Sequence, residues 1–237
     1  MANLRGFEID AVIIDLDGTL VDTLGDFCLA LNGMLADLPW PFSDSQVEPA
    51  QVRLWVGQGS EHLIRCGLKH VLMQHAVVPA GPVEPAPDLQ HLALQHYQRH
   101  YASINGQQSE PFPGVVPSLQ RLQAQGLRLA CLTNKPTVFA RELLRLKALD
   151  GFFPLLFGGD SFARKKPDPL PVQMTCQALQ SLPGRTMVIG DSSNDARAAR
   201  AAGCPVLLMA HGYNHGEPIS AVPADAYAEG WPSLWEP

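Results

Sequence analysis

The second half of the chain alternates between two kinds of segment, and this alternation constrains the fold more than any other feature. Apolar stretches typical of strands, namely "LRLACLT", "FPLLFGG", "RTMVIGD" and "PVLLMA", are separated by stretches with helical periodicity. Strands that alternate with helices favour parallel pairing through right-handed crossovers, with helices on both faces of the sheet. The sequence therefore predicts an α/β fold with a doubly wound parallel sheet.

One more strand is expected near the start of the chain, at about residues 9–14, where the run "AVII" is typical of a strand covered on both faces. From residue 22 to about 110 the pattern is almost wholly helical, with capping-box spacing at Ser45 and Glu48 and a proline-rich loop at residues 77–88. We expect an α/β core formed by residues 1–21 and 112–237, and a helical domain at residues 22–111. An insertion at the carboxyl edge of an open sheet is suited to act as a lid over a ligand site.

Composition excludes several classes of function. The chain has 237 residues, of which 46% are hydrophobic, so it can bury a substantial core. Its net charge of -6 argues against a nucleic-acid partner. The five cysteines are widely spaced without a CxxC pair, which favours free thiols in a reducing compartment. The N-terminus lacks the apolar region of a signal peptide, and no apolar run is long enough to span a membrane. We expect a cytoplasmic protein without a membrane partner.

Polar side chains follow the predicted strands at the edge where parallel sheets bind ligands. Taken singly, each has a plain structural explanation, because Asp-Gly pairs make turns and "SSND" suits the start of a helix. Their occurrence after several strands of one sheet predicts a functional site instead. The residues are Asp15, Asp17, Thr133, Asn134, Lys165, Lys166, Asp191 and Asp195.

The residue types suit a phosphate ester and Mg²⁺. Three carboxylates, those of Asp15, Asp17 and Asp191, offer the hard oxygen ligands that Mg²⁺ prefers. Phosphoryl transfer needs cations around the phosphoryl oxygens, and Mg²⁺ and a lysine can provide them. A calcium loop of the EF-hand type fits less well, because Gly18 lies at the fourth position rather than the sixth and a strand precedes it.

The same segment can carry the chemistry of hydrolysis. One aspartate can act as the nucleophile and form an aspartyl-phosphate. A second aspartate two residues later can protonate the leaving oxygen and then activate water. The Thr133 hydroxyl can donate to the phosphoryl group, and backbone amides near Asp17, Gly18 and Asn134 can bind an anion.

Four motifs occur in order along the chain: "DLDGTLVD", "LTNKP", "KKPDP" and "VIGDSSNDARAARAAG". With them, the sequence resembles the haloacid dehalogenase superfamily of phosphatases, and in particular its bacterial phosphoglycolate phosphatase branch. The resemblance covers essentially the whole chain. It implies a Rossmannoid core typical of that superfamily with an inserted small α-helical cap domain, in which "WVGQG" looks like the cap loop. The segment "GYNHGEP" is similar to one typical of the branch.

The resemblance also implies roles for the aspartates. Asp15 would be the nucleophile and a Mg²⁺ ligand, and Asp17 the acid/base that ligates Mg²⁺ through its backbone carbonyl. Asp191 would be a further Mg²⁺ ligand. Asp195 would orient Lys166 or a metal-bound water.

Phosphoryl binding is implied for a further set of residues around the nucleophile. Lys166 would pair with the phosphoryl oxygens and with Asp15, and Gly18 would let the backbone turn toward the phosphate. The expected phosphate-binding residues are Asp15, Gly18, Thr133, Asn134 and Lys166.

The cap offers candidates for substrate recognition: Gly57, Gly59 and Arg65. Relatives usually carry a basic residue one position after Arg65, and a shift of one residue on a helix turns the side chain by about 100°. Arg53 and Lys69 are therefore candidates for binding a substrate carboxylate as well, although a surface charge is the favoured interpretation of each of the three basic residues.

Two histidine pairs allow more than one interpretation. His96 and His100 have the spacing of a helical metal chelate, but no zinc motif accompanies them, so a solvated or interface helix face is favoured. His211 and His215 could line the active edge or stabilise their own loop.

These features predict a Mg²⁺-dependent phosphatase that hydrolyses 2-phosphoglycolate through an aspartyl-phosphate, with a small phosphorylated substrate as its partner. Another small phosphate ester, or a sugar phosphomutase reaction of the β-phosphoglucomutase type, is the alternative. A signalling receiver module fits less well, because its acceptor aspartate lies on a middle strand and no cap accompanies it. Both a monomer and a homodimer agree with the sequence.

Overall fold

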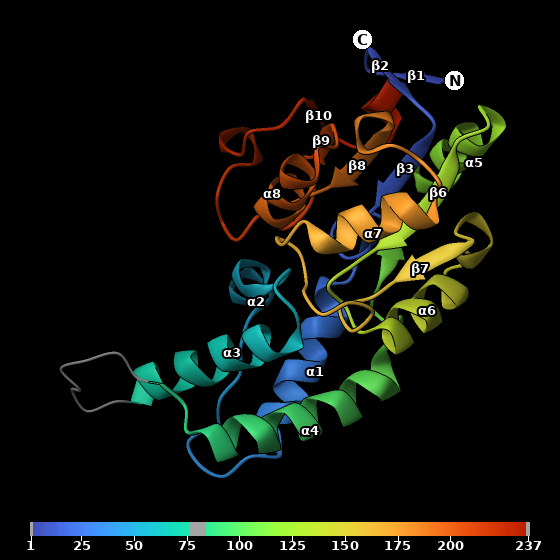
Figure 1. Cartoon of the computed structure of the whole chain (residues 1–237). Helices are drawn as coiled ribbons and strands as arrows, with labels where there is room; N and C mark the ends of the chain where they lie inside the picture. The colour runs from blue at the N-terminus through green and yellow to red at the C-terminus, as the bar shows by residue number, and fades with distance from the viewer. Residues whose placement is uncertain (1, 76–83, 236–237) are drawn as a thin grey trace. The chain divides into compact units, whose positions relative to one another are not determined.

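A computed structural model describes residues 2–75 and 84–235 of the chain. The chain divides into two compact units. One unit is formed by Met1–Asp22 together with Glu110–Pro237, and the other by Thr23–Ser109. Each unit is described by itself below, with the element labels of Figure 1.

The first unit is built on a parallel sheet. In the described part of the chain its six strands lie in the order β10-β9-β8-β3-β6-β7, and all neighbours pair in parallel. The strands are β3 (Ala11–Ile14), β6 (Arg128–Leu132), β7 (Leu155–Phe157), β8 (Thr186–Gly190), β9 (Val206–Met209) and β10 (Ala226–Ala228). Because β6 lies on one side of β3 and β8 on the other, β3 sits where the strand order reverses, the usual place of ligand sites in such sheets.

Helices cover both faces of this sheet, as Figure 1 shows. The alternation of β3 explains the two layers, because Val12 and Ile14 enter one hydrophobic cluster while Ala11 and Ile13 enter another. The first cluster includes residues of α5 and α6, and the second includes residues of α7 and α8. The helices are α5 (Val115–Ala124), α6 (Thr137–Leu146), α7 (Leu170–Ala178) and α8 (Ser193–Ala202). The predicted doubly wound α/β fold is confirmed.

Two short antiparallel pairs complete the first unit, and the sequence patterns did not predict them. The strand expected at residues 9–14 begins only at Ala11, because β1 (Ala2–Leu4) and β2 (Phe7–Ile9) form a hairpin of their own. Arg5 and Gly6 both have positive φ, as a two-residue hairpin turn requires. The strands β4 (Val21–Asp22) and β5 (Glu110–Pro111) pair where the chain leaves and re-enters this unit.

The second unit is wholly helical in its described part. Its helices are α1 (Leu24–Ala36), α2 (Pro49–Trp55), α3 (Ser60–His75) and α4 (Pro87–Ile104). The capping box expected at Ser45 is wrong: Glu48 caps α2, and its backbone N–H donates to the side chain of Gln51. The loop expected at residues 77–88 lies largely outside the described residues, and its last two residues already belong to α4, because proline fits the first turn of a helix.

Stacked aromatic rings and a buried carboxylate hold this helical unit together. Tyr101 stacks on Phe27 of α1 and on Tyr97 of its own helix, with ring centroids 5.7 and 5.6 Å apart. The fully buried Asp26 accepts from the backbone N–H groups of Gly106 (2.6 Å) and Gln108 (2.7 Å) and from the Ser109 hydroxyl. This carboxylate therefore fixes the segment that follows α4 against the start of α1.

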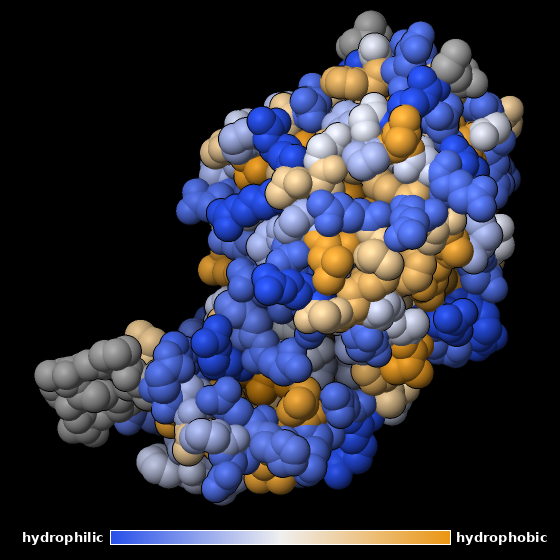
Figure 2. Space-filling model, viewed as in Figure 1, coloured by the Kyte–Doolittle hydropathy of each residue, from blue (hydrophilic) through white to orange (hydrophobic). Residues whose placement is uncertain are grey.

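Hydrophilic residues cover much of the face drawn in Figure 2, with smaller hydrophobic areas among them. Among the described residues, no helix has both the length and the apolar character that crossing a membrane requires. The five cysteines are free thiols, and four of them are buried.

Candidate active site

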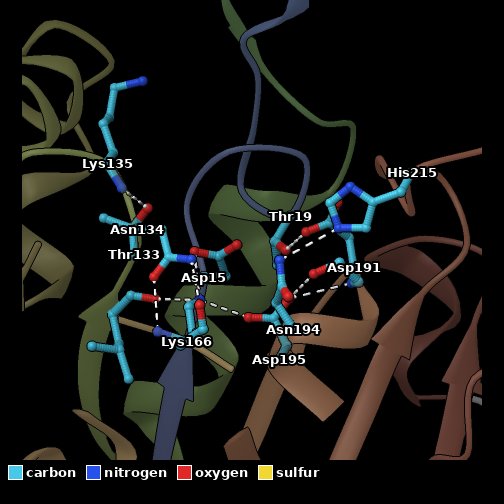
Figure 3. A network of polar contacts seen from close by, with 12 residues as sticks. Asp15, Thr19, Thr133, Asn134, Lys135, Lys166, Asp191, Asn194, Asp195 and His215 are labelled. Atoms are coloured by element: carbon cyan, nitrogen blue, oxygen red, sulfur yellow. Dashed lines mark hydrogen bonds and ion pairs between the residues drawn. The ribbon is translucent and has the colours of Figure 1, made fainter. Parts of the chain in front are cut away.

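The polar residues that follow β3, β6 and β8 meet at the carboxyl edge of the sheet (Figure 3). Asp15 comes directly after β3, and its backbone N–H donates to Ile189 of β8 at 2.9 Å, which continues the strand pairing to the first residue of the site. Asp191 follows β8, and Thr133 and Asn134 follow β6. Since the three strands are neighbours, residues far apart in the sequence lie side by side.

Lys166 lies at the centre of this group. Its ammonium donates to the backbone oxygen of Leu132 (2.8 Å) and to Oδ1 of Asp195 (2.6 Å), and it lies 2.9 Å from Oδ1 of Asp15 as an ion pair. Burial alone would lower the pKa of Lys166, but Asp15 and Asp195 raise it above the usual value for lysine. The lysine therefore stays charged and directs that charge at Asp15.

The carboxylates of the site outnumber the cations beside them. Oxygens of Asp15, Asp191 and Asp195 lie within 4.8 Å of one another. Burial raises the pKa of Asp15 to about 7, against the opposing effect of Lys166, and burial together with Asp195 and Asp15 raises the pKa of Asp191 well above its usual range. A divalent cation would relieve this repulsion, and oxygen donors are the ligands that Mg²⁺ prefers. The residues present therefore fit a magnesium ion.

Asp191 and Asp195 differ in what holds them. Asp191 accepts from the Thr19 hydroxyl (2.8 Å) and from the Tyr213 backbone N–H (2.6 Å), one donor on each oxygen. Oδ1 of Asp195 accepts from the Lys166 ammonium, and Oδ2 accepts from both the backbone N–H (3.2 Å) and the hydroxyl (2.7 Å) of Ser192. Both oxygens of Asp195 are thus engaged by protein donors, which suits a residue that orients Lys166.

The segment after β6 presents a hydroxyl and fixes the loop of Lys166. The Thr133 hydroxyl oxygen accepts from the Lys135 backbone N–H at 3.1 Å, so its own proton can be donated elsewhere. The Asn134 amide makes two bonds with the backbone of Lys166, accepting from its N–H (3.0 Å) and donating to its carbonyl (2.9 Å). The Asn134 side chain therefore holds Lys166, and phosphate binding by Asn134 would have to use its backbone.

Asp17 lies beside a second lysine that the sequence patterns did not single out. The Lys135 ammonium donates to Oδ1 of Asp17 at 2.8 Å, and the two side chains are 2% and 10% exposed. Thr19 and Tyr213 were also missed. The lysine inside "LTNKP" could have been considered as a site residue from the sequence. Tyr213 could not, because it binds Asp191 through its backbone N–H, which any residue except proline offers.

Gly18 provides the turn between Asp17 and the rest of the segment. Its φ is +83°, and a Cβ atom built there would overlap the Asp191 carboxylate and press on the ring of Tyr213. Its backbone N–H donates to the carbonyl of Val21 at 2.9 Å. A side chain at this position would therefore be strained and would displace a carboxylate of the candidate metal site.

The cap candidates lie in the helical unit. Gly57 and Gly59 have φ of 110° and 92° and separate α2 from α3. Arg65 is exposed and bonds to Nδ1 of His62 at 3.2 Å, while Lys69 forms an ion pair with Glu84. The positions of Arg65 and Lys69 within the helical unit agree both with substrate recognition and with a solvated surface.

The histidine pairs have polar partners close by. His96 and His100 both contact Oδ2 of Asp37, at 3.0 and 2.6 Å, and so join α4 to the end of α1. Among the described residues, the metal-competent group of acidic and histidine side chains is the one at the sheet edge, and it does not include this pair. His215 lies 3.4 Å from the Asn194 amide beside the active edge (Figure 3), and His211 lies 3.2 Å from the Thr19 carbonyl oxygen.

Comparison with known proteins agrees with this arrangement. The family model of haloacid dehalogenase-like hydrolases matches residues 9–203. A phosphoglycolate phosphatase from Thiobacillus denitrificans is 40% identical over 228 residues, which are 96% of this chain and 93% of that protein. One from Nitrosospira multiformis is 38% identical over the same shares. The crystal structure of a predicted phosphoglycolate phosphatase from Haemophilus somnus superposes with a TM-score of 0.84 at 30% identity, covering 94% of this chain and 95% of that one.

The match of the family model includes β3, β6 and β8 and the acidic and basic residues that follow them. The relatives match over nearly the full length of the chain, so the resemblance is not confined to the core motifs. The chain belongs to the haloacid dehalogenase-like hydrolase family.

Proposed function

We propose that this hydrolase is a Mg²⁺-dependent phosphatase that converts 2-phosphoglycolate to glycolate and phosphate. The observation that carries the proposal is the pairing of each of two aspartates with its own lysine. Asp15 lies 2.9 Å from Lys166, and Asp17 lies 2.8 Å from Lys135. Two carboxylates two residues apart, each beside a cation, suit a nucleophile and a proton donor for a dianionic phosphate ester. The names of the relatives support the choice of ester.

In the proposed reaction, Asp15 attacks phosphorus and forms an aspartyl-phosphate. A nucleophilic carboxylate must be ionised, and positive charge beside Asp15 lowers its pKa from the raised value that burial gives it. Lys166 holds the attacking carboxylate and stays close to the phosphoryl oxygens. The Thr133 hydroxyl, which accepts from a backbone N–H, donates its proton to one of those oxygens.

Asp17 acts as the general acid and then as the general base. It gives a proton to the leaving oxygen of the ester and then takes one from the water that attacks the phosphoryl group on Asp15. Asp15, Asp191 and the backbone carbonyl of Asp17 would hold Mg²⁺, which would supply charge neutralisation for the phosphoryl oxygens. Thr19 and Tyr213 keep the Asp191 carboxylate oriented for that ion.

A hydrolysis screen tests the proposal. Phosphate release is measured from 2-phosphoglycolate, 2-hydroxyethyl phosphate and glucose 1-phosphate, each with Mg²⁺ and with EDTA. We expect 2-phosphoglycolate to give the highest kcat/KM, with activity lost in EDTA, and Asp17→Asn to lower kcat by about 10²-fold or more. Hydrolysis of the other esters without release from 2-phosphoglycolate would reject the substrate. Conversion of glucose 1-phosphate to glucose 6-phosphate would indicate a mutase instead.

A further inference from the structure

Lys135, the partner of Asp17, has no assigned contact with the substrate in the reaction proposed above. It follows Thr133 and Asn134 at the end of β6, and its side chain is 2% exposed. Burying a lysine is costly unless its charge is paired, and here Oδ1 of Asp17 pairs with it at 2.8 Å. The ammonium is therefore fixed beside the residue that is proposed to protonate the leaving group.

The two buried lysines of the site have different partners. Lys166 has three acceptors for its three protons, on Leu132, Asp195 and Asp15, so its charge is directed at the nucleophile. The ammonium end of Lys135 points away from Lys166 in Figure 3. The Lys135 ammonium is therefore not directed at the carboxylate of Asp15, which Lys166 faces.

Bond lengths place the leaving group within reach of Lys135. A proton donor lies about 2.6–3.2 Å from the oxygen that it protonates. Since Lys135 lies 2.8 Å from an oxygen of Asp17, its ammonium is within about 6 Å of the ester oxygen. In 2-phosphoglycolate one methylene separates the ester oxygen from the carboxylate, so a carboxylate oxygen lies roughly 3 Å farther along the leaving group. A leaving group of this length is therefore long enough to reach the ammonium from an ester oxygen that Asp17 protonates.

We propose that Lys135 is a specificity-determining residue that binds the carboxylate of the leaving group and selects phosphate esters with a second negative charge. The inference rests on the proposed function and assigns substrate recognition to the core rather than to a cap residue such as Arg65. The Lys135 ammonium contacts both Asp17 and the substrate carboxylate. Binding of that carboxylate therefore also fixes the leaving oxygen beside Asp17, its proton donor.

Two substrates that differ only at this carboxylate test the proposal. The ratio of kcat/KM for 2-phosphoglycolate to that for 2-hydroxyethyl phosphate is measured in the wild type, Lys135→Met and Lys135→Arg. Since both substrates use Asp17 in the same way, any effect of Lys135 on Asp17 cancels in the ratio. The ratio is also independent of the fraction of folded enzyme, so a poorly folding variant still gives an answer.

We expect Lys135→Met to lower the ratio by about 10- to 100-fold, the effect of losing a charge-assisted hydrogen bond, mainly through a higher KM for 2-phosphoglycolate. Lys135→Arg should keep part of the preference. Lys147→Met removes a half-buried lysine of the same unit that pairs with the exposed Glu110 and not with a site carboxylate; it is the matched control and should leave the ratio unchanged.

The outcomes separate the two proposals. A wild-type enzyme that hydrolyses both esters equally would reject 2-phosphoglycolate as the substrate and, with it, the role of Lys135. A wild-type preference that Lys135→Met retains would overturn the role of Lys135 alone. Equal losses on both esters would show that Lys135 acts only through Asp17, and would overturn it as well.

Discussion

Replacing Asp195 by asparagine is expected to release Lys166 without changing the residues Asp15, Asp17 and Thr133. Asp195 receives three hydrogen bonds, one from the Lys166 ammonium at 2.6 Å and two from Ser192. An asparagine has one acceptor oxygen, so it can satisfy only one side, and its NH₂ group would face the donors on the other. A hydrogen bond to a charged group contributes about 1.5–3 kcal/mol, and a helix cap about 1 kcal/mol. We therefore expect Asp195→Asn to lower the free energy of unfolding by about 3 kcal/mol.

The effect on catalysis is expected to be larger than stability alone explains. With Lys166 no longer held toward Asp15, the rate constant kcat should fall by about 10²-fold. Ser192→Ala is the matched control, because it removes the other half of the same capping box and leaves the Lys166–Asp195 bond intact. It should cost about 1 kcal/mol of stability with a much smaller change in kcat. Urea unfolding and steady-state phosphate release measure the two quantities. Equal kcat values for both variants would refute the argument that Asp195 positions Lys166.

Three further predictions follow from the packing. Gly212→Ala places a Cβ atom into the Asp191 carboxylate and should raise the Mg²⁺ concentration for half-maximal activity at least about tenfold. Gly151→Ala is the control, because its Cβ atom meets no neighbouring atom, and it should leave that concentration unchanged. Asp26→Ala removes a fully buried acceptor from three donors, of which the Ser109 hydroxyl is buried, and should lower the free energy of unfolding by about 3 kcal/mol. Hydrogen exchange should become faster in the helical unit than in the core, and uniform exchange would contradict this. Hydrogen bonds from two histidines and an arginine lower the pKa of Asp37 far below its usual value. Its contribution, about 1 kcal/mol at this partly exposed site, is therefore fully present above about pH 4 and is lost only as the pH falls through the lowered pKa. Urea unfolding of Asp37→Asn and wild type should differ at pH 7, and the difference should shrink steadily as the pH is lowered below about 4; a difference that does not change with pH would contradict this.

The sequence predicted the sheet because burial determined the apolar composition of its strands, and their alternation with helices indicated parallel pairing. β3 is covered on both faces, and its four apolar residues leave little choice of structure. Asp15, Lys166 and Asp191 were predicted for a related reason: each stands where a strand or a loop ends at the carboxyl edge. The structure brings them together.

Features that depend on pairing were not predictable in the same way. β10 has three residues and β4 only two, too short for a periodic pattern, and their existence depends on partners elsewhere in the chain. The α2 cap was placed at Ser45, because residue type suggests a capping box without showing which residue starts the helix. The Lys135–Asp17 pair joins residues 118 positions apart, a proximity that local sequence does not reveal.

The pairing of β4 with β5 has a consequence for how such a chain can change over evolution. Val21 pairs with Pro111 and Asp22 with Glu110, so the points where the chain leaves and re-enters the core are direct neighbours. A turn of a few residues could join Asp22 to Glu110 and close the core without the helical unit. The helical unit can therefore be lengthened, replaced or removed as a module, while the strands that carry the catalytic residues keep their register.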